Sequence, residues 1–298
     1  MGDANGWFYR KDWFADEQIR ADFEAEHGRE LAEPASQKEL LELAKFFTGR
    51  EIDGNTVYGA SIFTERGSEG ITMGVTSALY PWGFKYEREP GTYDMQGVVN
   101  SPEAVEALEF YKALYECCTP PGYTNAYMSE TLDAFKSGQV AMAMNWFAFF
   151  PGLAKDPTVG DKIDFFVNPP QNVKGSTLGG QGISVVSYSK HQEAALEYIK
   201  WFAQPEVQQR WWTLGGYSAR NSVLEDPGFV DSQPFARDFL EAMGQVQDFW
   251  QEPAYAELLI AMQKRMHDYV IADQGTAQEA LDKLVEDWTE VFEDEGKL

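Results

Sequence analysis

The chain has 298 residues, of which 44% are hydrophobic and 14% aromatic, and its formal net charge at pH 7 is −24. This length allows one large domain or two modest domains with a buried core. So acidic a surface repels nucleic acid and anionic membranes, and we expect neither as a partner. No apolar run approaches the ~20 residues that span a bilayer, and residues 1–16 lack the apolar region of a signal peptide.

Apolar periodicity and capping signals predict the elements of the first part of the chain. Ser36 and Glu39 have the spacing of a capping box ahead of an apolar stripe, which predicts a helix that ends near Gly49. In chain order we predict a helix-rich opening (6–27), this helix, a strand (57–63), a buried helix (70–82) and a short hairpin region (86–99).

The second part begins with a strong helix start. Ser101, Pro102 and Glu103 supply an N-cap, a first-turn proline and an acid near the positive end of the helix dipole. We predict a helix to Cys118, then a helix (129–136), strands (140–144, 162–167, 182–186), helices (191–203, 205–214) and a mainly helical remainder (234–292). Helices that alternate with short apolar strands indicate an α/β architecture. Cys117 and Cys118 are adjacent, and we expect free, partly buried thiols.

Motifs for covalent or metal chemistry are not organised in this sequence. The three histidines, His27, His191 and His267, are far apart, and no Gly-x-Ser-x-Gly motif is present. The glycine-rich segment 179–182 precedes a predicted strand and therefore fits neither a P-loop nor a dinucleotide fingerprint. We predict no catalytic residue, no metal and no cofactor. A carboxylate pair for glycoside hydrolysis stays open as an alternative, because an acid-rich chain always offers candidates.

Aromatic residues stand beside glycine at the ends of several predicted elements, within 80–83, 144–147, 178–182 and 211–217. Flat apolar faces beside glycine turns suit a ligand that is flat on one side and polar at its edges, as a sugar ring is. For each aromatic residue alone, packing is an equal alternative, but together they favour binding. We predict as ligand contacts Trp82, Trp146, Trp212 and Tyr217 with Asn145, Gln181, Arg220, Asp3 and Asn5, and as core Phe46, Phe47, Phe110, Tyr111, Tyr198 and Phe202.

Several segments resemble, in the right order, the family 1 extracellular solute-binding proteins of ABC importers, the group that contains maltose-binding protein. The matching segments are 8–14, 100–108, 135–142, 179–183 and 195–202 with 205–208. The resemblance implies an α/β fold of the periplasmic-binding-protein-like (type II) two-lobe class. Its lobes close on a carbohydrate, and the permease transmembrane subunits recognise the closed form. It also implies no enzymatic activity, a periplasmic or extracellular location, and a monomer for the full-length protein.

The resemblance further implies that most of the N-terminal lobe is missing from this chain. Residues 1–175 then form the second lobe, 176–232 a remnant of the first, and 233–298 a helical return that packs mainly on the second. By position, the segments that line the family's cleft include Trp82, Asn145, Trp146, Gly180, Gln181 and Tyr217. Gln181 stands where many relatives have an aromatic residue. We expect weak or no sugar binding by this chain alone. A fragment without ligand function that exposes apolar surface is a further alternative.

Overall fold

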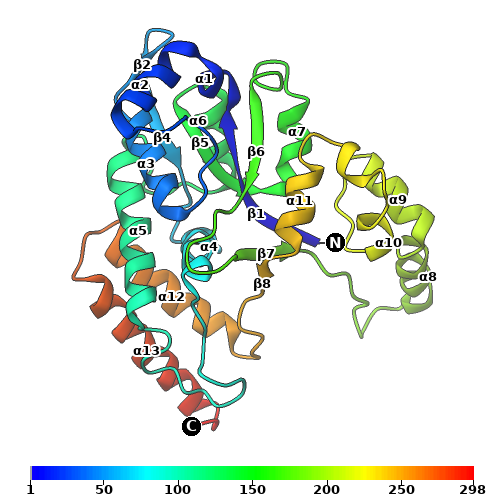
Figure 1. The fold of residues 1–298 in the computed structure, drawn as a ribbon. Coiled ribbons are helices and arrows are strands. Elements are labelled where there is room, and N and C mark those ends of the chain that lie inside the picture. The colour runs from blue at the N-terminus through cyan, green and yellow to red at the C-terminus, as the bar shows by residue number, and fades with distance from the viewer. Residues whose placement is uncertain (1) are drawn as a thin grey trace.

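The computed structural model describes residues 2–298 as an α/β fold around a six-stranded mixed sheet (Figure 1). The strands follow the order β4 (Tyr58–Ser61), β5 (Val140–Trp146), β1 (Gly2–Arg10), β7 (Ser176–Gly180) and β8 (Val246–Gln247), and β6 (Ile163–Val167) also pairs with β1. β1 runs antiparallel to β5, β6 and β7, whereas β4 is parallel to β5 and β7 to β8. β2 (Glu51–Ile52) and β3 (Asn55–Thr56) form a separate small ribbon.

The prediction of a helix-rich opening is wrong for its first residues, because residues 2–10 form β1, the central strand of the sheet. All nine residues of β1 are buried. Trp7 and Tyr9 enter the core on one face, and Ala4 and Phe8 enter the core on the other. Because both faces are covered, the apolar residues of this strand run on without the alternation of a half-exposed strand. The helical pattern begins only at Lys11.

Helices surround the sheet and account for most of the remaining chain. They are α1 (Lys11–Ala15), α2 (Glu17–His27), α3 (Gln37–Phe47), α4 (Gly70–Trp82), α5 (Pro102–Cys118), α6 (Met128–Lys136), α7 (Phe150–Ala154), α8 (Gln192–Phe202), α9 (Pro205–Thr213), α10 (Asn221–Leu224), α11 (Ala236–Met243), α12 (Tyr255–Val270) and α13 (Ala277–Asp294), with short 3₁₀ turns η1 (Phe147–Phe149) and η2 (Phe229–Asp231). Within residues 2–298, none of these helices combines the length and the apolar character needed to cross a bilayer.

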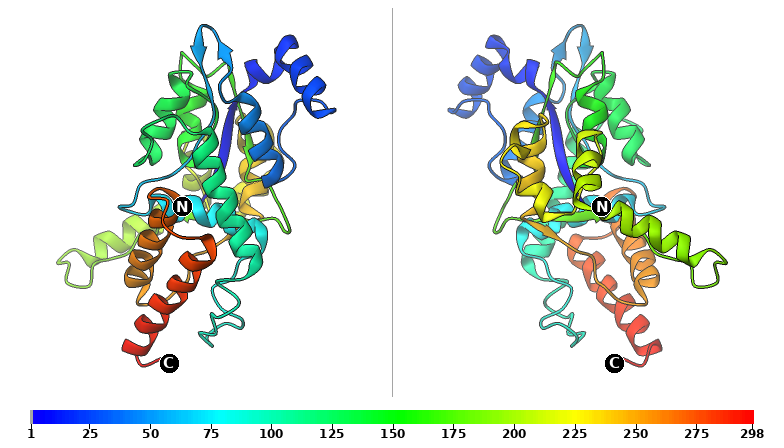
Figure 2. Two further views of the ribbon diagram at one scale, coloured as in Figure 1. Left: turned by 90° about the vertical axis from the view of Figure 1, so that its left-hand side faces the viewer. Right: turned by 90° about the vertical axis from the view of Figure 1, so that its right-hand side faces the viewer.

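Two cores lie on the two faces of the sheet. Buried side chains of α3, α4, α5, α12 and α13 form one core, and those of α6, α7 and α11 contribute to the other. α12 and α13 pack together and extend away from the sheet toward the C-terminus (Figures 1 and 2). α8 differs from these helices because it contains no buried residue, and with α9 and α10 it protrudes to one side of the fold (Figure 1).

Capping signals predicted some elements closely, and turn signals failed at two places. The helices expected at 70–82 and from Ser101 to Cys118 are α4 and α5, and the Ser101 hydroxyl accepts the Ala104 N–H as predicted for an N-cap. The hairpin expected at 86–99 is wrong, because this segment consists of turns held by side chains such as the Arg88–Asp94 ion pair. The strand expected at 182–186 is also wrong: β7 ends at Gly180.

The prediction of free thiols is wrong as well, because Cys117 and Cys118 are joined by a disulfide. The two residues lie in the last turn of α5, where the chain leaves the helix at Thr119 in an extended conformation. The prediction assumed that cysteines must be separated to pair, and the bond between these neighbours contradicts that assumption. Cys118 is buried and Cys117 is partly buried.

The contact between β4 and α3 gives a first test of the fold. A Cβ atom at Gly59 would overlap the backbone carbonyl of Ala44, whereas nothing lies within 4 Å of a Cβ at Gly152 in α7. Gly59→Ala should therefore lower the free energy of unfolding by about 2 kcal/mol or more, because a helix backbone cannot move aside cheaply. Gly152→Ala should leave it unchanged or raise it by up to about 1 kcal/mol. Urea unfolding followed by circular dichroism measures both, and equal midpoints for the two variants would contradict the packing described.

Candidate functional site

A pocket of about 400 Å³, here called the sheet-edge pocket, lies where β1 begins and where β5 and β7 end. Antiparallel pairing brings these ends together, since Asn5 of β1 pairs with Trp146 and Asp3 pairs with Gly179. The lining residues come from these strands, from the starts of α4 and α6, and from the segment after β8. They are Asp3, Glu69, Met73, Tyr127, Met128, Trp146, Ala148, Phe149, Gly179, Gly180, Gln181 and Phe249.

A contact between a glycine and an aromatic ring shapes one wall of this pocket. A Cβ atom at residue 179 would overlap the six-membered ring of the Trp146 indole, so the absence of a side chain at Gly179 lets the ring lie against β7. The next residue, Gly180, has a φ of 125°, a conformation that glycine adopts readily and other residues rarely adopt. The two glycines thus provide a flat aromatic surface beside a bare stretch of backbone.

Asn145 fixes the position of Trp146 and does not line the pocket itself. Its Nδ2 donates to the carbonyl of Met128 and to Oγ1 of Thr131, each at 2.9 Å, and its Oδ1 accepts the N–H of Trp146 at 2.8 Å. The side chain is fully buried. These bonds tie the end of β5 to the start of α6, so that Trp146 and Tyr127 are held relative to each other.

Asp3 places a buried carboxyl group in the sheet-edge pocket. Its Oδ1 accepts the N–H of Ala4 at 2.9 Å and the N–H of Ala148 at 3.2 Å, while its Oδ2 accepts no hydrogen bond from residues 2–298. Only 5% of the residue is exposed. Burial raises the pKa of Asp3 to about 7, although the two N–H donors act in the opposite direction.

Other residues predicted as ligand contacts lie in the core and not in the pocket. Trp82 packs against Phe110, with ring centroids 5.1 Å apart. The hydroxyl of Tyr217 donates to the carbonyl of Phe147, and its ring belongs to the core on the α11 side. Trp212 lies in the same core. The side-chain amide of Asn5 is buried and makes no hydrogen bond within residues 2–298. We therefore leave these residues and Asn145 out of the proposed site.

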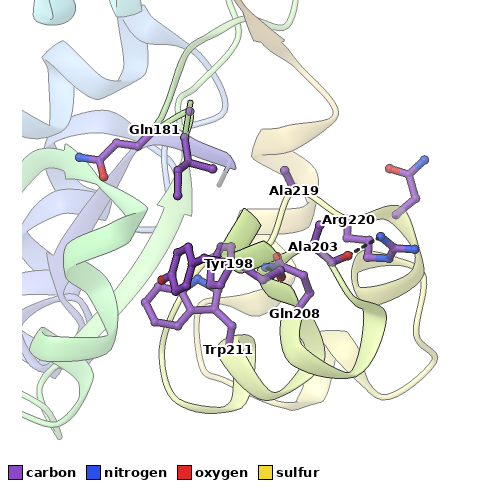
Figure 3. Close-up of a pocket in the computed structure, with 11 residues that line it drawn as sticks. Gln181, Tyr198, Ala203, Gln208, Trp211, Ala219 and Arg220 are labelled. Atoms are coloured by element: carbon purple, nitrogen blue, oxygen red, sulfur yellow. Dashed lines mark hydrogen bonds between the residues drawn. The ribbon is translucent and has the colours of Figure 1, made fainter. Parts of the chain in front are cut away.

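A second pocket of about 760 Å³, here called the helical pocket, lies between the segment that follows β7 and the helices α8 and α9 (Figure 3). Tyr198, Phe202 and Trp211 supply aromatic rings to it, and Gln181 lines both pockets. Arg220 lines it too, and its Nη1 donates to the carbonyl of Ala203 at 2.9 Å (Figure 3).

The core prediction for Tyr198 and Phe202 is wrong. Tyr198 is 53% exposed, and Phe202 is only partly buried. The apolar stripe that predicted burial is present on α8, but within residues 2–298 nothing buries it. The other aromatic residues expected in the core, Phe46, Phe47, Phe110 and Tyr111, are buried as predicted.

Sequence reasoning missed several lining residues of the sheet-edge pocket. Glu69 and Tyr127 stand immediately before α4 and α6, and Phe149 follows Trp146 in an aromatic run, so their places at element ends carried a usable signal. Phe249 follows the two-residue strand β8, for which the sequence has no signal. Within the described residues, no group of three or more His, Cys, Asp or Glu side chains could hold a metal ion.

Comparison with known proteins places the chain among solute-binding proteins. A family described as bacterial extracellular solute-binding protein matches residues 3–237. The chain is 24% identical over 230 residues to a probable ABC transporter-binding protein of Deinococcus radiodurans, which covers 75% of this chain and 54% of that protein. It is 27% identical over 208 residues to a probable amino-acid ABC transporter periplasmic-binding protein of Sinorhizobium fredii, which covers 68% and 44%. The chain thus spans about half the length of the curated relatives it matches.

Solved structures share the fold. Maltose-bound MalE3 of T. maritima superposes with a TM-score of 0.77 at 23% identity, over 97% of this chain and 71% of that one. A solute-binding protein of Thermotoga lettingae bound to α-D-tagatose gives a TM-score of 0.79 at 21% identity, over 97% and 70%. At these identities the likeness shows the fold, and it agrees with the α/β class predicted from the sequence.

The buried carboxyl of Asp3 predicts a pH-dependent stability. Its pKa rises from 3.8 to about 7 on folding, so its contribution to stability is fully present below about pH 4 and is lost as the pH rises through about 7. Asp3→Asn keeps an oxygen for the N–H groups of Ala4 and Ala148 but cannot ionise. The free energy of unfolding of the wild type minus that of the variant should therefore fall by about 2–4 kcal/mol across this window.

Urea titrations at several pH values measure this difference. The pKa of Asp238 is also raised to about 7, chiefly by burial, so the wild type alone would report both groups. Comparison with Asp3→Asn isolates Asp3, and parallel stability profiles for the two proteins would contradict the prediction.

Proposed function

Because the chain belongs to the bacterial extracellular solute-binding proteins, we propose that it is part of the solute-binding component of an ABC importer and that a carbohydrate occupies the sheet-edge pocket. The observation that carries the proposal is the Trp146 ring against Gly179 with the Asp3 carboxyl in the same pocket. A sugar ring presents an apolar C–H face to an aromatic ring and hydroxyl groups to acceptors at its edge. The sugar ligands of the solved relatives with this fold support the same class.

Within this proposal each lining residue has a distinct part. Trp146 supplies the stacking surface, and Tyr127 with Phe249 supplies further apolar wall. Asp3 Oδ2 accepts a ligand hydroxyl, since its partner oxygen is already occupied by two N–H groups. Gly180 and Gln181 present backbone and amide groups at the pocket edge, and Gln181 in place of an aromatic residue leaves room for polar contacts.

We also propose that a further α/β lobe completes the cleft in the whole protein. The chain covers about 70% of the neighbouring structures, although these cover 97% of it. Large apolar side chains between residues 183 and 201 are about half exposed or more, as expected for a surface that another lobe covers: Ile183, Val186, Tyr188, Leu196, Tyr198 and Trp201. The lobe boundaries near 175 and 232, hinge closure, delivery to permease transmembrane subunits, a periplasmic or extracellular location and a monomeric full-length protein belong to this proposal.

The first test of the proposal uses two tryptophans in different pockets. With one lobe incomplete, we expect this chain to bind sugars such as maltose with a Kd on the order of millimolar. Trp146→Ala should weaken this binding at least about tenfold, because the stacking surface is lost. Trp211→Ala, in the helical pocket, should leave it unchanged. Ligand-detected NMR titration measures both. Tight binding by this chain would refute the incomplete cleft, and equal effects of the two variants would refute the choice of pocket.

The exposed apolar side chains of α8 predict self-association of this chain. The side chains of Trp201 and Leu196 are each about half exposed. Light scattering should show a mass that rises with protein concentration, and the double change Leu196→Gln with Trp201→Gln should abolish the rise. Ile260→Gln, which removes a large exposed side chain on α12, is the matched control. A mass independent of concentration would contradict a covered α8 surface.

A carbohydrate-active enzyme with a carboxylate pair is the second candidate. It is favoured by one observation, namely that Asp3 and Glu69 both line the sheet-edge pocket, since two carboxyl groups flanking a sugar are what glycoside hydrolysis requires. The family is one of binding proteins, which is why we prefer binding. Release of nitrophenol from nitrophenyl glycosides, lost in Asp3→Asn, would reverse this preference.

A further inference from the structure

Two acidic side chains line the sheet-edge pocket, and within residues 2–298 no basic side chain lines it. The two are Asp3 and Glu69. Burial raises the pKa of the Tyr127 hydroxyl, a hydrogen bond with the Trp146 side chain opposes this, and the charges of Glu69 and Glu65 raise the pKa further, which places both charges close to this wall. Glu130 accepts the N–H of Tyr127, and Asp248 directly precedes Phe249. Among the ion pairs of residues 2–298, none includes any of these carboxylates: Asp3, Glu65, Glu69, Glu130 and Asp248.

Two of these carboxylates have an oxygen that accepts no hydrogen bond from residues 2–298. Asp3 is only 5% exposed and lines the pocket, and its Oδ2 accepts no hydrogen bond from residues 2–298 but keeps some contact with solvent, since it is not one of the fully buried unpaired atoms. Oε2 of Glu65 is buried and also without a hydrogen bond. A buried acceptor without a donor costs about 1–3 kcal/mol. At Asp3 the Oδ2 atom is open to the pocket, where a ligand can supply the donor, and a charged donor makes the stronger bond.

The pocket walls add a second attraction for a cation. Trp146, Tyr127, Phe149 and Phe249 present aromatic rings to the same space. Aromatic faces attract ammonium groups by about 0.5–2 kcal/mol, with the larger values in desolvated sites. A concave site lined by one sign of charge also concentrates its field, so it attracts cations and repels anionic solutes. Arg66 is adjacent to Glu65 in the sequence, but its charge lies near His267, whose pKa it helps to lower, and Arg66 does not line the pocket.

We propose that the sheet-edge pocket selects carbohydrates that carry a protonated amino group over neutral sugars and over sugar acids. The proposal rests on the carbohydrate-binding function proposed above and names the substrate class of that same site. The ammonium group donates to Asp3 Oδ2 and lies over the rings of the aromatic wall, while Glu69 adds negative potential at the pocket entrance. The rest of the sugar ring stacks on Trp146.

The test compares matched sugars that differ at one position. D-glucosamine, D-galactosamine and D-mannosamine are compared with the parent hexoses, with the neutral N-acetyl derivatives and with D-glucuronate, by ligand-detected NMR titration at neutral pH and low salt. At least one amine should bind about tenfold tighter than its parent sugar, a difference of about 1.4 kcal/mol. D-glucuronate should bind more weakly than the hexoses. Added salt should shrink the preference for the amine, because screening weakens the attraction between charges.

Two variants separate this preference from sugar binding in general. Asp3→Asn keeps an acceptor for the N–H groups of Ala4 and Ala148 and should weaken binding of the amine more than binding of the parent hexose, so that the preference for the amine falls to less than about threefold. Glu290→Gln removes the same charge from the exposed face of α13, away from the pocket lining, and should change neither affinity.

The outcomes distinguish the two proposals. Equal binding of amines, N-acetyl sugars and hexoses, with all of them weakened by Trp146→Ala, would overturn the selectivity and keep the carbohydrate site. A preference for amines that persists in Asp3→Asn would overturn the role of Asp3 in that selectivity. Failure of every sugar to bind at millimolar concentrations would overturn the carbohydrate site, and the selectivity with it.

Discussion

The pairing of β1 on both of its edges is the constraint on which the rest of the structure depends. This nine-residue strand is bonded to β5 on one side and to β6 and β7 on the other, and its side chains enter both cores. Its first residues lie beside the last residues of β5 and β7 because all three pairings are antiparallel. The buried carboxyl, the indole and the glycine-rich backbone come from positions 3, 146 and 179, and only this pairing brings them together.

Glycines beside aromatic rings recur as a packing device. A Cβ at Gly6 would overlap the Phe147 ring, one at Gly179 would overlap Trp146, and one at Gly216 would overlap Trp211. In each case the missing side chain leaves room for a large ring directly against the backbone. The aromatic and glycine pattern of the sequence therefore has two origins. Trp146 and Trp211 face pockets, whereas Phe147 serves the core.

The sequence predicted those features that local signals encode. Ser101 and Pro102 marked the start of α5, and the apolar run from Val140 marked β5. β1 escaped because a strand buried on both faces shows no period of two, and its aromatic residues resemble those of a buried helix. Burial also depends on partners that periodicity does not report, which is why Tyr198 has a core-like position in the sequence and lies exposed.

Part of the candidate site could likewise be predicted from local signals in the sequence. Asp3, Trp146, Gly180 and Gln181 line the sheet-edge pocket and stand at element ends that the sequence marks. Trp82 and Tyr217 stand at similar ends but turn into the cores, because the direction of a side chain depends on which face of the fold its neighbours fill. Phe249 arrives from a distant part of the chain, and only the tertiary fold places it beside Trp146.

The hydrogen bonds of Asn145 hold one wall of the pocket in place. Trp146 and Met128 are joined through one buried amide, which connects the end of β5 to the first turn of α6. Gly180 on the opposite side is the last residue of β7 and is held in the sheet by its pairing with Gly2. A solute that stacks on Trp146 therefore meets a preorganised surface, so that little conformational entropy of the protein is lost on that side of the pocket when it binds.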